Sequence, residues 1–431
     1  MSSHAHAGAR ALASTTHFDA IVVGRGAVGA AAALGLAQSG LRTAIVAPVP
    51  RAGAPARGPA ASGGEGGGAS DGEGGENWDA RVFALSPASR TLLQGLRVWD
   101  AIDAERVAPV HEMRVYPSAA PDAPELFFDA YEGCVDALAW IVEGRNLGAA
   151  FDRALGFAAV ASIDARLAGV SADPASSWAA VTLEDGRELQ AKLVIGADGA
   201  ASPLRSAAGI GTSERLYPQR AVVANLRIGK PHRDCAYQWF GGHGILALLP
   251  LPGDRCSIVW SAPLPLADAL LECDAGRLAH RVNEVAQGRL GELERITPQQ
   301  AYPLRLLEVE RAIAPRVALV GDAAHVVHPL AGQGMNLGLG DVQALLRVMH
   351  AREPFRDPGD RLLLRRYERS RAEAVASMRV ATDGLQRLFD PESDLPLPAL
   401  MQPLAGLREL GWRIVESSPW LKRRLIAHAA S

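Results

Sequence analysis

The sequence has little of what marks secreted, membrane-spanning or nucleic-acid-binding proteins. It has only four cysteines, and no two are spaced as CxxC, which argues against a disulfide scaffold and indicates reduced thiols in a cytosolic protein. The N-terminus lacks the apolar core of a signal peptide. No run of roughly 18 uncharged apolar residues appears, so a membrane span is not expected, while peripheral membrane contact stays open. The formal net charge of −3 gives no signature of a nucleic-acid partner.

A glycine turn near the start of the chain predicts a dinucleotide-binding unit. Residues 20–23 form an apolar run typical of a buried strand, and residues 27–39 are rich in Ala and Leu, which favours a helix. Between them lies Gly24-Arg25-Gly26-Ala27-Val28-Gly29, a GxGxxG motif at a strand-to-helix junction. The first glycine allows a tight turn, the second lets the backbone approach a pyrophosphate, and the third lets the helix pack against the strand. The motif alone is weak, but its βαβ context indicates dinucleotide binding.

One residue of this pattern is missing. The second strand, predicted over residues 42–47, should end on an acidic residue that binds a ribose hydroxyl. Ala47-Pro48 stands there instead. The ribose must therefore be held by another group or by water.

Two later strand ends carry carboxylates. The apolar run 193–196 leads into Ala197-Asp198-Gly199, and the run 317–320 leads into Gly321-Asp322. Asp198 either caps the approach to a short helix predicted at Ser202-Pro203 or faces a ligand, because open α/β sheets bind ligands at the carboxyl ends of their strands.

The segment after Asp322 predicts a glycine loop and a helix start. Gly332-Gln333-Gly334 precedes a helix expected from Met335 onward, and a helix start offers free N–H groups and positive dipole to a polar cofactor. His325 and His328 lie in the same loop. A metal site would need a third ligand that is not evident, so we expect structural hydrogen bonds there and no metal.

The chain divides into segments that alternate between two kinds of structure. Its 431 residues suffice for two or three domains. We expect an α/β fold, with a Rossmann-like cofactor domain, an inserted antiparallel-sheet substrate domain and C-terminal helices. The predicted boundaries are residues 17–110 (with a flexible Gly-rich insertion at 51–77), 131–212 and 306–390 for the cofactor domain, 111–130 and 213–305 for the substrate domain, and 391–431 for a C-terminal helical region.

Together these motifs resemble those of a known family. The order and spacing of Gly24-Gly26-Gly29, Ala197-Asp198-Gly199 and Gly321-Asp322 resemble the FAD-dependent aromatic hydroxylases, single-component flavoprotein monooxygenases of the p-hydroxybenzoate hydroxylase fold. The stretches 79–86 (DARVFALS) and 328–338 (HPLAGQGMNLG) look like the ubiquinone-biosynthesis branch, which hydroxylates polyprenylated phenol intermediates.

The resemblance implies a role for each matching residue and for the partners. Contacts with FAD are implied for Gly24, Gly26, Ala27, Gly29, Arg81, Arg145, Asp198, Gly199, Gly321, Asp322, Pro329, Gly332, Gln333, Gly334, Met335 and Asn336. Asp322 would hold a ribityl hydroxyl, and residues 329–336 would line the flavin ring. The reaction would use a hydrophobic aromatic substrate and O2, with NAD(P)H as electron donor, and proceed through a flavin C4a-hydroperoxide. No residue is singled out as catalytic, because the cofactor does the hard step.

Three functional classes stay open at this stage. The first is a hydroxylase of quinone biosynthesis, in the cytoplasm or peripheral to the inner face of the membrane, and in complex with other enzymes of that route or alone. The second is a flavoprotein with another reaction, such as hydroxylation of a small aromatic compound or reduction of prenyl chains. The third is a non-catalytic accessory subunit. The basic segment Trp420-Leu421-Lys422-Arg423-Arg424 would suit either an anionic membrane surface or a packed terminal helix.

Overall fold

The computed structural model describes residues 17–48, 78–117, 125–173, 176–327 and 333–389. The predicted insertion at 51–77 and the C-terminal region 391–431 lie outside these residues. So do His328, Pro329 and Gly332.

The first unit is built on an eight-stranded sheet whose central strands are parallel. Its main path runs β18-β19-β11-β1-β2-β8, and β10 and β9 continue from β11 as an antiparallel extension. The strands are β1 (His17–Val23), β2 (Thr43–Val46), β8 (Val160–Ile163), β9 (Leu167–Ser171), β10 (Ala179–Leu183), β11 (Glu188–Gly196), β18 (Ile313–Ala314) and β19 (Val317–Leu319). The apolar runs expected to be buried strands are buried, as β1, β11 and β19 pair in parallel.

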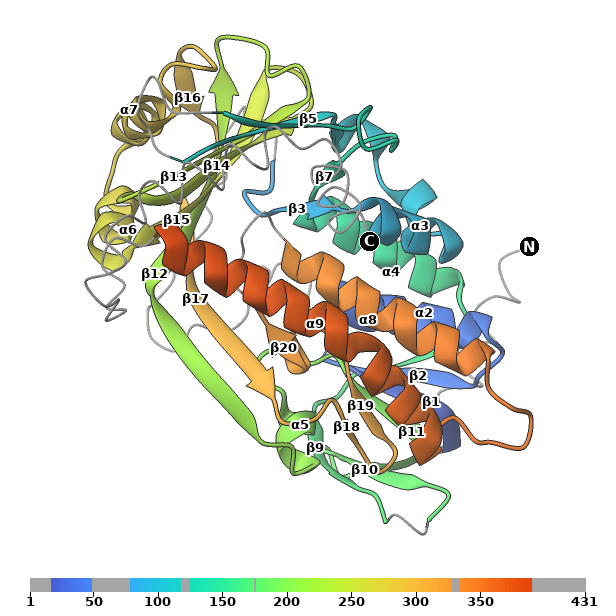
Figure 1. Ribbon diagram of the computed structural model, residues 1–431. Coiled ribbons are helices and arrows are strands. Elements are labelled where there is room, and N and C mark those ends of the chain that lie inside the picture. The colour runs from blue at the N-terminus through green and yellow to red at the C-terminus, as the bar shows by residue number, and fades with distance from the viewer. Residues whose placement is uncertain (1–16, 49–77, 118–124, 174–175, 328–332, 390–431) are drawn as a thin grey trace.

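Helices cover one face of this sheet. They are α2 (Ala27–Gln38), α4 (Gly144–Phe157), α8 (Gln333–His350) and α9 (Arg361–Phe389), with α3 (Pro87–Gly95) beside them. Helix α8 packs between α2 and α9 (Figure 1). Short α5 (Pro203–Ala207) lies against the extension of β9 and β10. Ser86 caps α3 by accepting from the Ser89 N–H, with Pro87 at the first helical position.

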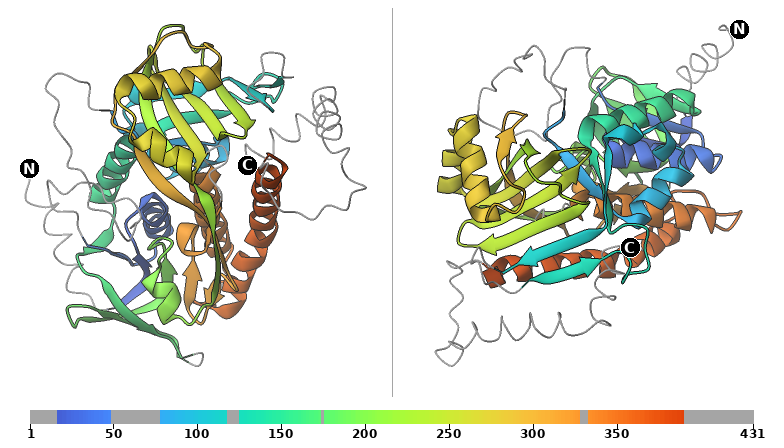
Figure 2. Two further views of the ribbon diagram at one scale, coloured as in Figure 1. Left: turned by 90° about the vertical axis from the view of Figure 1, so that its left-hand side faces the viewer. Right: turned by 90° about the horizontal axis from the view of Figure 1, so that it is seen from above.

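The second unit is a nine-stranded, mainly antiparallel sheet. Its path runs β20-β17-β12-β15-β14-β13-β5-β6, with β16 paired to β12. The strands are β5 (Glu112–Tyr116), β6 (Leu126–Asp129), β12 (Thr212–Ile228), β13 (Cys235–Gly241), β14 (Gly244–Leu251), β15 (Arg255–Pro263), β16 (Leu293–Arg295), β17 (Gln300–Val309) and β20 (His325–Val326). Helices α6 (Leu264–Leu271) and α7 (Ala275–Ala286) cover its outer face, and the sheet lies between them and the first unit (Figure 2).

A three-stranded sheet joins the two units. It consists of β3 (Val82–Leu85), β7 (Ala139–Glu143) and β4 (Val107–Val110) in the order β3-β7-β4. One face carries Trp140 and Val142 into the core of the first unit, and the other carries Ile141 toward Ala236 and Leu251 of the second. The predicted α/β class with an inserted antiparallel sheet and C-terminal helices is confirmed. We retain the residue boundaries of the domains as a proposal.

The start of α8 differs from the prediction. The helix was expected from Met335 but begins at Gln333, so Gly334 lies in its first turn. Glycine is tolerated there because the first-turn N–H groups have no partner inside the helix, so that turn is the least dependent on residue propensity.

Candidate functional site

Three of the predicted site segments meet because their strands are neighbours. Val23 of β1 pairs with Gly196 of β11, and Gly196 pairs with Leu319 of β19. The three parallel strands therefore end at one level, and the loops that follow them emerge side by side. This edge of the sheet holds Gly24, Asp198 and Asp322 together, although they lie far apart in the sequence.

The glycine turn is tightly packed at its first and third glycines and open at its second. Gly24 has φ +107°, and a Cβ there would lie 2.2 Å from the Ala197 carbonyl oxygen. A Cβ on Gly29 would lie 2.2 Å from the Gly24 oxygen. A Cβ on Gly26 would meet no atom within 4 Å, and Gly26 caps α2 without any side-chain hydrogen bond. The first and third glycines thus serve close packing, while Gly26 and the Ala27 helix start are open to an anion.

The structure shows the capping role of Asp198, and its second carboxylate oxygen is placed so that a ligand could meet it. Its Oδ2 accepts a hydrogen bond from the Leu204 N–H and so caps the start of α5. Its Oδ1 is buried and accepts no hydrogen bond from the described residues, and burial raises the pKa of the carboxyl group. A buried oxygen without a donor costs free energy unless a ligand supplies one. The neighbouring Gly199, at φ +85°, has no atom within 4 Å of a Cβ position, which leaves room there.

Asp322 lies in a recess. Its side chain is accessible to solvent, yet the protein around it is dense enough to raise the pKa of the carboxyl group. The positive charges of His325, Arg81 and Arg305 act in the opposite direction but do not cancel this rise. No described residue donates a hydrogen bond to its carboxylate. An accessible carboxylate enclosed by protein is suited to accept a ligand hydroxyl, as predicted for a ribityl chain.

A buried charge network holds the Asp322 loop in place. Asp341 of α8 is 1% exposed, and its Oδ2 lies 2.7 Å from His325 Nε2 and accepts the Gly321 N–H at 2.8 Å. Its Oδ1 accepts from Arg371 Nε of α9 at 2.7 Å, and Arg371 also donates to the Leu337 carbonyl. Burial alone would lower the pKa of His325, but the Asp341 carboxylate raises it overall. The expected structural bonding of His325 is confirmed.

Arg81 and Arg145 are brought together by a residue that the sequence did not single out. Asp79 accepts the Arg81 N–H on Oδ1 at 3.0 Å and the Arg145 N–H on Oδ2 at 2.9 Å. The Arg81 guanidinium lies 4.9 Å from the Phe83 ring centroid and 5.9 Å from that of Tyr302 in β17. Arg81 thus stands between the cofactor edge and the second sheet. Its positive charge is near enough to Asp322 to oppose the rise in the pKa of the Asp322 carboxyl group.

The start of α8 is fixed by Asn336. Its Nδ2 donates to the Ala84 carbonyl, and its Oδ1 accepts from the Ser86 N–H and the Ser89 hydroxyl. The side chain therefore ties α8 to β3 and α3, which leaves backbone N–H groups as the means by which this turn would meet a cofactor. A Cβ on Gly334 would meet nothing within 4 Å, whereas Met335 packs on the core. The cofactor contacts proposed for residues 333–336 rest on this helix start.

These features fit FAD. The open glycine turn suits a pyrophosphate, the recessed carboxylate suits a polyol, and the α8 start, which has no acidic residue in its first turn, suits a ring that becomes negatively charged.

Comparison with known proteins decides the family. Residues 153–382 match the model of an FAD binding domain family, FAD_binding_3. Ubiquinone hydroxylase UbiL of Rhodospirillum rubrum is 33% identical over 415 residues, which cover 95% of this chain and 89% of that protein. The 3-demethoxyubiquinol 3-hydroxylase of Escherichia coli is 32% identical over 413 residues, with 95% and 97% covered. The chain belongs to the ubiquinone-biosynthesis branch of the FAD-dependent aromatic hydroxylases. It is an FAD-dependent monooxygenase.

The fold of this hydroxylase has solved counterparts. PqsL of Pseudomonas aeruginosa, described as a probable FAD-dependent monooxygenase, superposes with a TM-score of 0.70 at 23% identity, covering 87% of this chain and 97% of PqsL. At that identity the likeness supports the fold alone.

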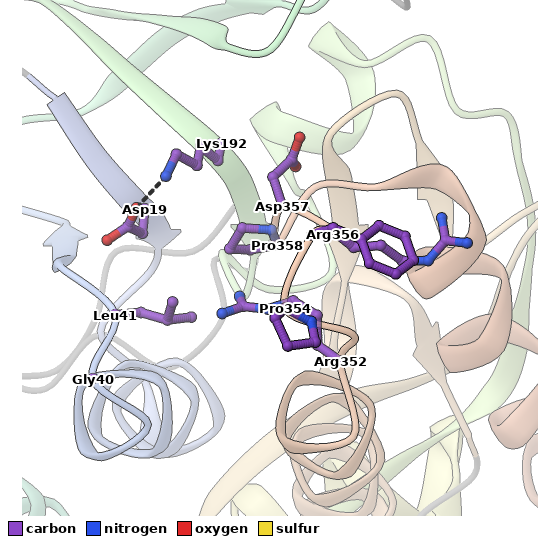
Figure 3. Close-up of a pocket in the computed structure, with 10 residues that line it drawn as sticks. Asp19, Gly40, Leu41, Lys192, Arg352, Pro354, Arg356, Asp357 and Pro358 are labelled. Carbon is purple, nitrogen blue, oxygen red and sulfur yellow. Dashed lines mark hydrogen bonds and ion pairs between the residues drawn. The ribbon is translucent and has the colours of Figure 1, made fainter.

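Two further observations concern parts of the described chain away from this edge. Among the described residues, no three His, Cys, Asp or Glu side chains gather as metal ligands. A recess of about 400 Å³ lies near the first residues of β1, at the end opposite the glycine turn (Figure 3). Lys192 in its wall pairs with Asp19 at 2.8 Å, and Asp357 pairs with Arg316 at 2.9 Å. The first pair joins β1 to β11, and the second joins the β18–β19 turn to the α8–α9 connection, so the recess lies where these elements meet.

Several residues of the site escaped the sequence analysis. Arg205 is buried and donates to the carbonyls of Ala200 and Ala323, which ties the Asp198 loop to the Asp322 loop. Asp341 could have been found from the sequence, since it and Asp322 are the only Asp, Glu, Lys or Arg residues between 317 and 346. Asp79 and Arg371 could not have been found in this way, because both act through contacts that only the folded chain creates.

Proposed function

We propose that this hydroxylase adds a hydroxyl group to the aromatic ring of a polyprenylated phenol intermediate of ubiquinone biosynthesis, with O2 as oxygen source and NAD(P)H as electron donor. One observation carries the proposal. The relatives named ubiquinone hydroxylase and 3-demethoxyubiquinol 3-hydroxylase align along 89% and 97% of their own length, so the likeness includes the second sheet as well as the cofactor motifs. Bound FAD supplies the reaction with O2 that delivers one oxygen atom to the ring.

The face of the second sheet that points away from α6 and α7 offers a place for the substrate ring. Val223 of β12, Val259 of β15 and Ala247 of β14 are cross-strand partners on that face, and the last two are only half-buried. They form an apolar floor of small side chains. Asn225, two residues along β12, donates to the Asp79 carbonyl and so joins this floor to the loop that carries Arg81. We place the ring over this floor, next to the flavin end of the site.

The protein's part in the reaction is positioning and electrostatics. The Asp322 recess would hold the ribityl chain, and the first turn of α8 would stabilise negative charge on the reduced ring through its N–H groups and dipole. The apolar sheet face would orient the substrate and exclude water. These steps need no acid or base from the chain.

A prenylated substrate favours work at a membrane surface. No helix within the described ranges is long and apolar enough to cross a bilayer. We propose peripheral contact with the inner face of the membrane through the basic segment near residue 422, and association with other enzymes of quinone biosynthesis. Sedimentation with anionic vesicles, comparing the full chain with one truncated after residue 390, tests the contact. Equal binding would rule out that segment as the contact.

The chemical proposal is tested with purified protein and with a gene deletion. FAD-loaded protein, NADPH or NADH, isotopically labelled O2 and a short-chain prenylphenol should yield a product that carries one labelled oxygen, detected by mass spectrometry. Deletion of the gene should accumulate a quinone precursor that lacks one ring hydroxyl. A normal quinone pool together with a changed small aromatic metabolite would refute the substrate assignment.

A further inference from the structure

This chain lacks the usual acceptor for the adenosine half of FAD. Strand β2 ends at Val46, and Ala47 follows where dinucleotide-binding folds place a carboxylate for the ribose hydroxyls. The ribose must therefore be held by water or by groups from other elements at this edge of the sheet.

Three side chains gather beside the end of β2. Arg25, inside the glycine turn, extends to α4, where its Nε and Nη2 donate to Asp152 Oδ1 at 3.3 and 3.1 Å. Its Nη1 donates to Ser162 Oγ of β8 at 2.9 Å. Strand β8 pairs in parallel with β2, and Ser162 is the partner of Ile45. The Arg25 side chain thus runs from the phosphate turn across the last residues of β2.

The arrangement leaves one oxygen of the Asp152 carboxylate available beside the end of β2. Both bonds from Arg25 go to Asp152 Oδ1, and no described residue donates to Oδ2. The Asp152 side chain is 65% exposed, while that of Arg25 is 25% exposed. The guanidinium therefore anchors one oxygen and leaves the other facing solvent. Arg25 also lies directly beside Gly26, whose Cβ position has no atom within 4 Å. An open phosphate position and an accessible acceptor thus follow one another along the sheet edge.

We propose that Asp152, positioned by Arg25 and assisted by Ser162, replaces the missing strand-end acid and binds the adenosine ribose hydroxyls of FAD. A ribose offers two adjacent hydroxyl donors, which a carboxylate oxygen and a serine hydroxyl can accept. The inference rests on the FAD site described above but not on the identity of the aromatic substrate.

The test compares two flavins. FMN shares the ring, the ribityl chain and one phosphate with FAD but has no adenosine. Full-length protein is stripped of flavin, and the Kd of each flavin is measured by fluorescence quenching. Asp152→Asn should raise the Kd of FAD about 10- to 100-fold, the range for one charge-assisted hydrogen bond, and leave the Kd of FMN unchanged. Arg25→Met should act in the same direction, and the double variant should add little, because the two residues act as one unit.

Matched variants give the comparison its controls. Arg153→Ala alters the next residue of α4, whose side chain donates to the Ala101 carbonyl, and should change neither Kd. Asp322→Asn should weaken FAD and FMN equally, since both carry the ribityl chain. If Asp152→Asn fails to fold by circular dichroism, Ser162→Ala removes only one exposed hydroxyl and should still weaken FAD selectively.

Two outcomes overturn the proposal. One is an unchanged Kd of FAD in folded Asp152→Asn, and the other is equal weakening of FAD and FMN, which would make Asp152 a structural residue of α4. Failure of the hydroxylation assay with normal FAD binding would refute the proposed substrate and leave this inference standing.

Discussion

Asp341→Asn should destabilise this hydroxylase more than any surface charge substitution. The carboxylate is 1% exposed and accepts from Gly321, His325 and Arg371 through two oxygens. Asparagine keeps the shape, but its amide nitrogen must face one of these donors, and Arg371 and His325 lose their counter-charge. Breaking a buried ion pair from one side costs about 3–5 kcal/mol. That is a large share of the roughly 5–15 kcal/mol by which domains are stable.

Urea unfolding followed by far-UV circular dichroism measures the effect. The flavin-free protein is used, so that ligand binding does not mask the change in the free energy of unfolding. Asp268→Asn is the matched control, because Asp268 pairs with Arg220 on the surface and such pairs contribute about 0.2–1 kcal/mol. A loss for Asp341→Asn no larger than that of the control would refute the view that this network carries the Asp322 loop.

The same network sets a pH window. The pKa of His325 is raised above its ordinary 6.5, so its stabilising contribution is complete below pH 6.5 and is lost as pH rises through the raised value. Burial would raise the pKa of Asp341, but His325 and Arg371 lower it below the ordinary 3.8, so that contribution is lost as pH falls through the lowered value. Both contributions are complete between pH 3.8 and pH 6.5, so wild-type stability should be highest there. Asp341→Asn should reduce the loss of stability at alkaline pH. An unchanged alkaline decline in the variant would exclude this coupling as its source.

Three further substitutions test the cofactor edge. Asp322→Asn should weaken FAD by about 1.5–3 kcal/mol, the worth of a charge-assisted hydrogen bond, as measured by titration calorimetry, and an unchanged Kd would make the carboxylate structural only. Gly24→Ala should abolish FAD retention, because the new Cβ would meet the Ala197 oxygen at 2.2 Å; a variant that purifies with full flavin absorbance contradicts this. Asn336→Ala removes three hydrogen bonds between α8 and the β3–α3 segment and should lower the melting temperature by several degrees, roughly 2–4 °C per kcal/mol, whereas Asn283→Ala on α7 should change it less.

The features that the sequence predicted are local ones. Each cofactor motif is an apolar strand followed at once by glycine or a carboxylate, so a short window contains both the strand and the group it positions. The three motifs then meet because parallel strands of one sheet end at one edge. The start of α8 was placed two residues late, because Gly334 was taken for part of the loop when a first helical turn accommodates it.

Residues that act across the fold were not predictable in this way. Arg25 meets Asp152 over 127 positions, and Arg371 meets Asp341 from a different helix. Neither pair has a periodic or motif signal, since each exists only when two helices have packed. Asp79 looked like an ordinary polar residue before a strand, yet it gathers two arginine N–H groups. The sequence therefore predicted the loops that gather at this edge of the sheet but not the side chains that hold them in place.

The hydrogen bonds of Asn336 determine when this site can form during synthesis of the chain. Asn336 bonds to Ser86, which left the ribosome 250 residues earlier, and β19 must add to β11 before the Asp322 recess exists. The site proposed for FAD is thus completed only when most of the chain has been synthesised, and contacts of such long sequence separation form slowly. We therefore expect the nascent polypeptide to meet its cofactor only after these contacts have formed. Cellular flavin supply should accordingly govern how much of this enzyme survives after release, rather than how fast it folds.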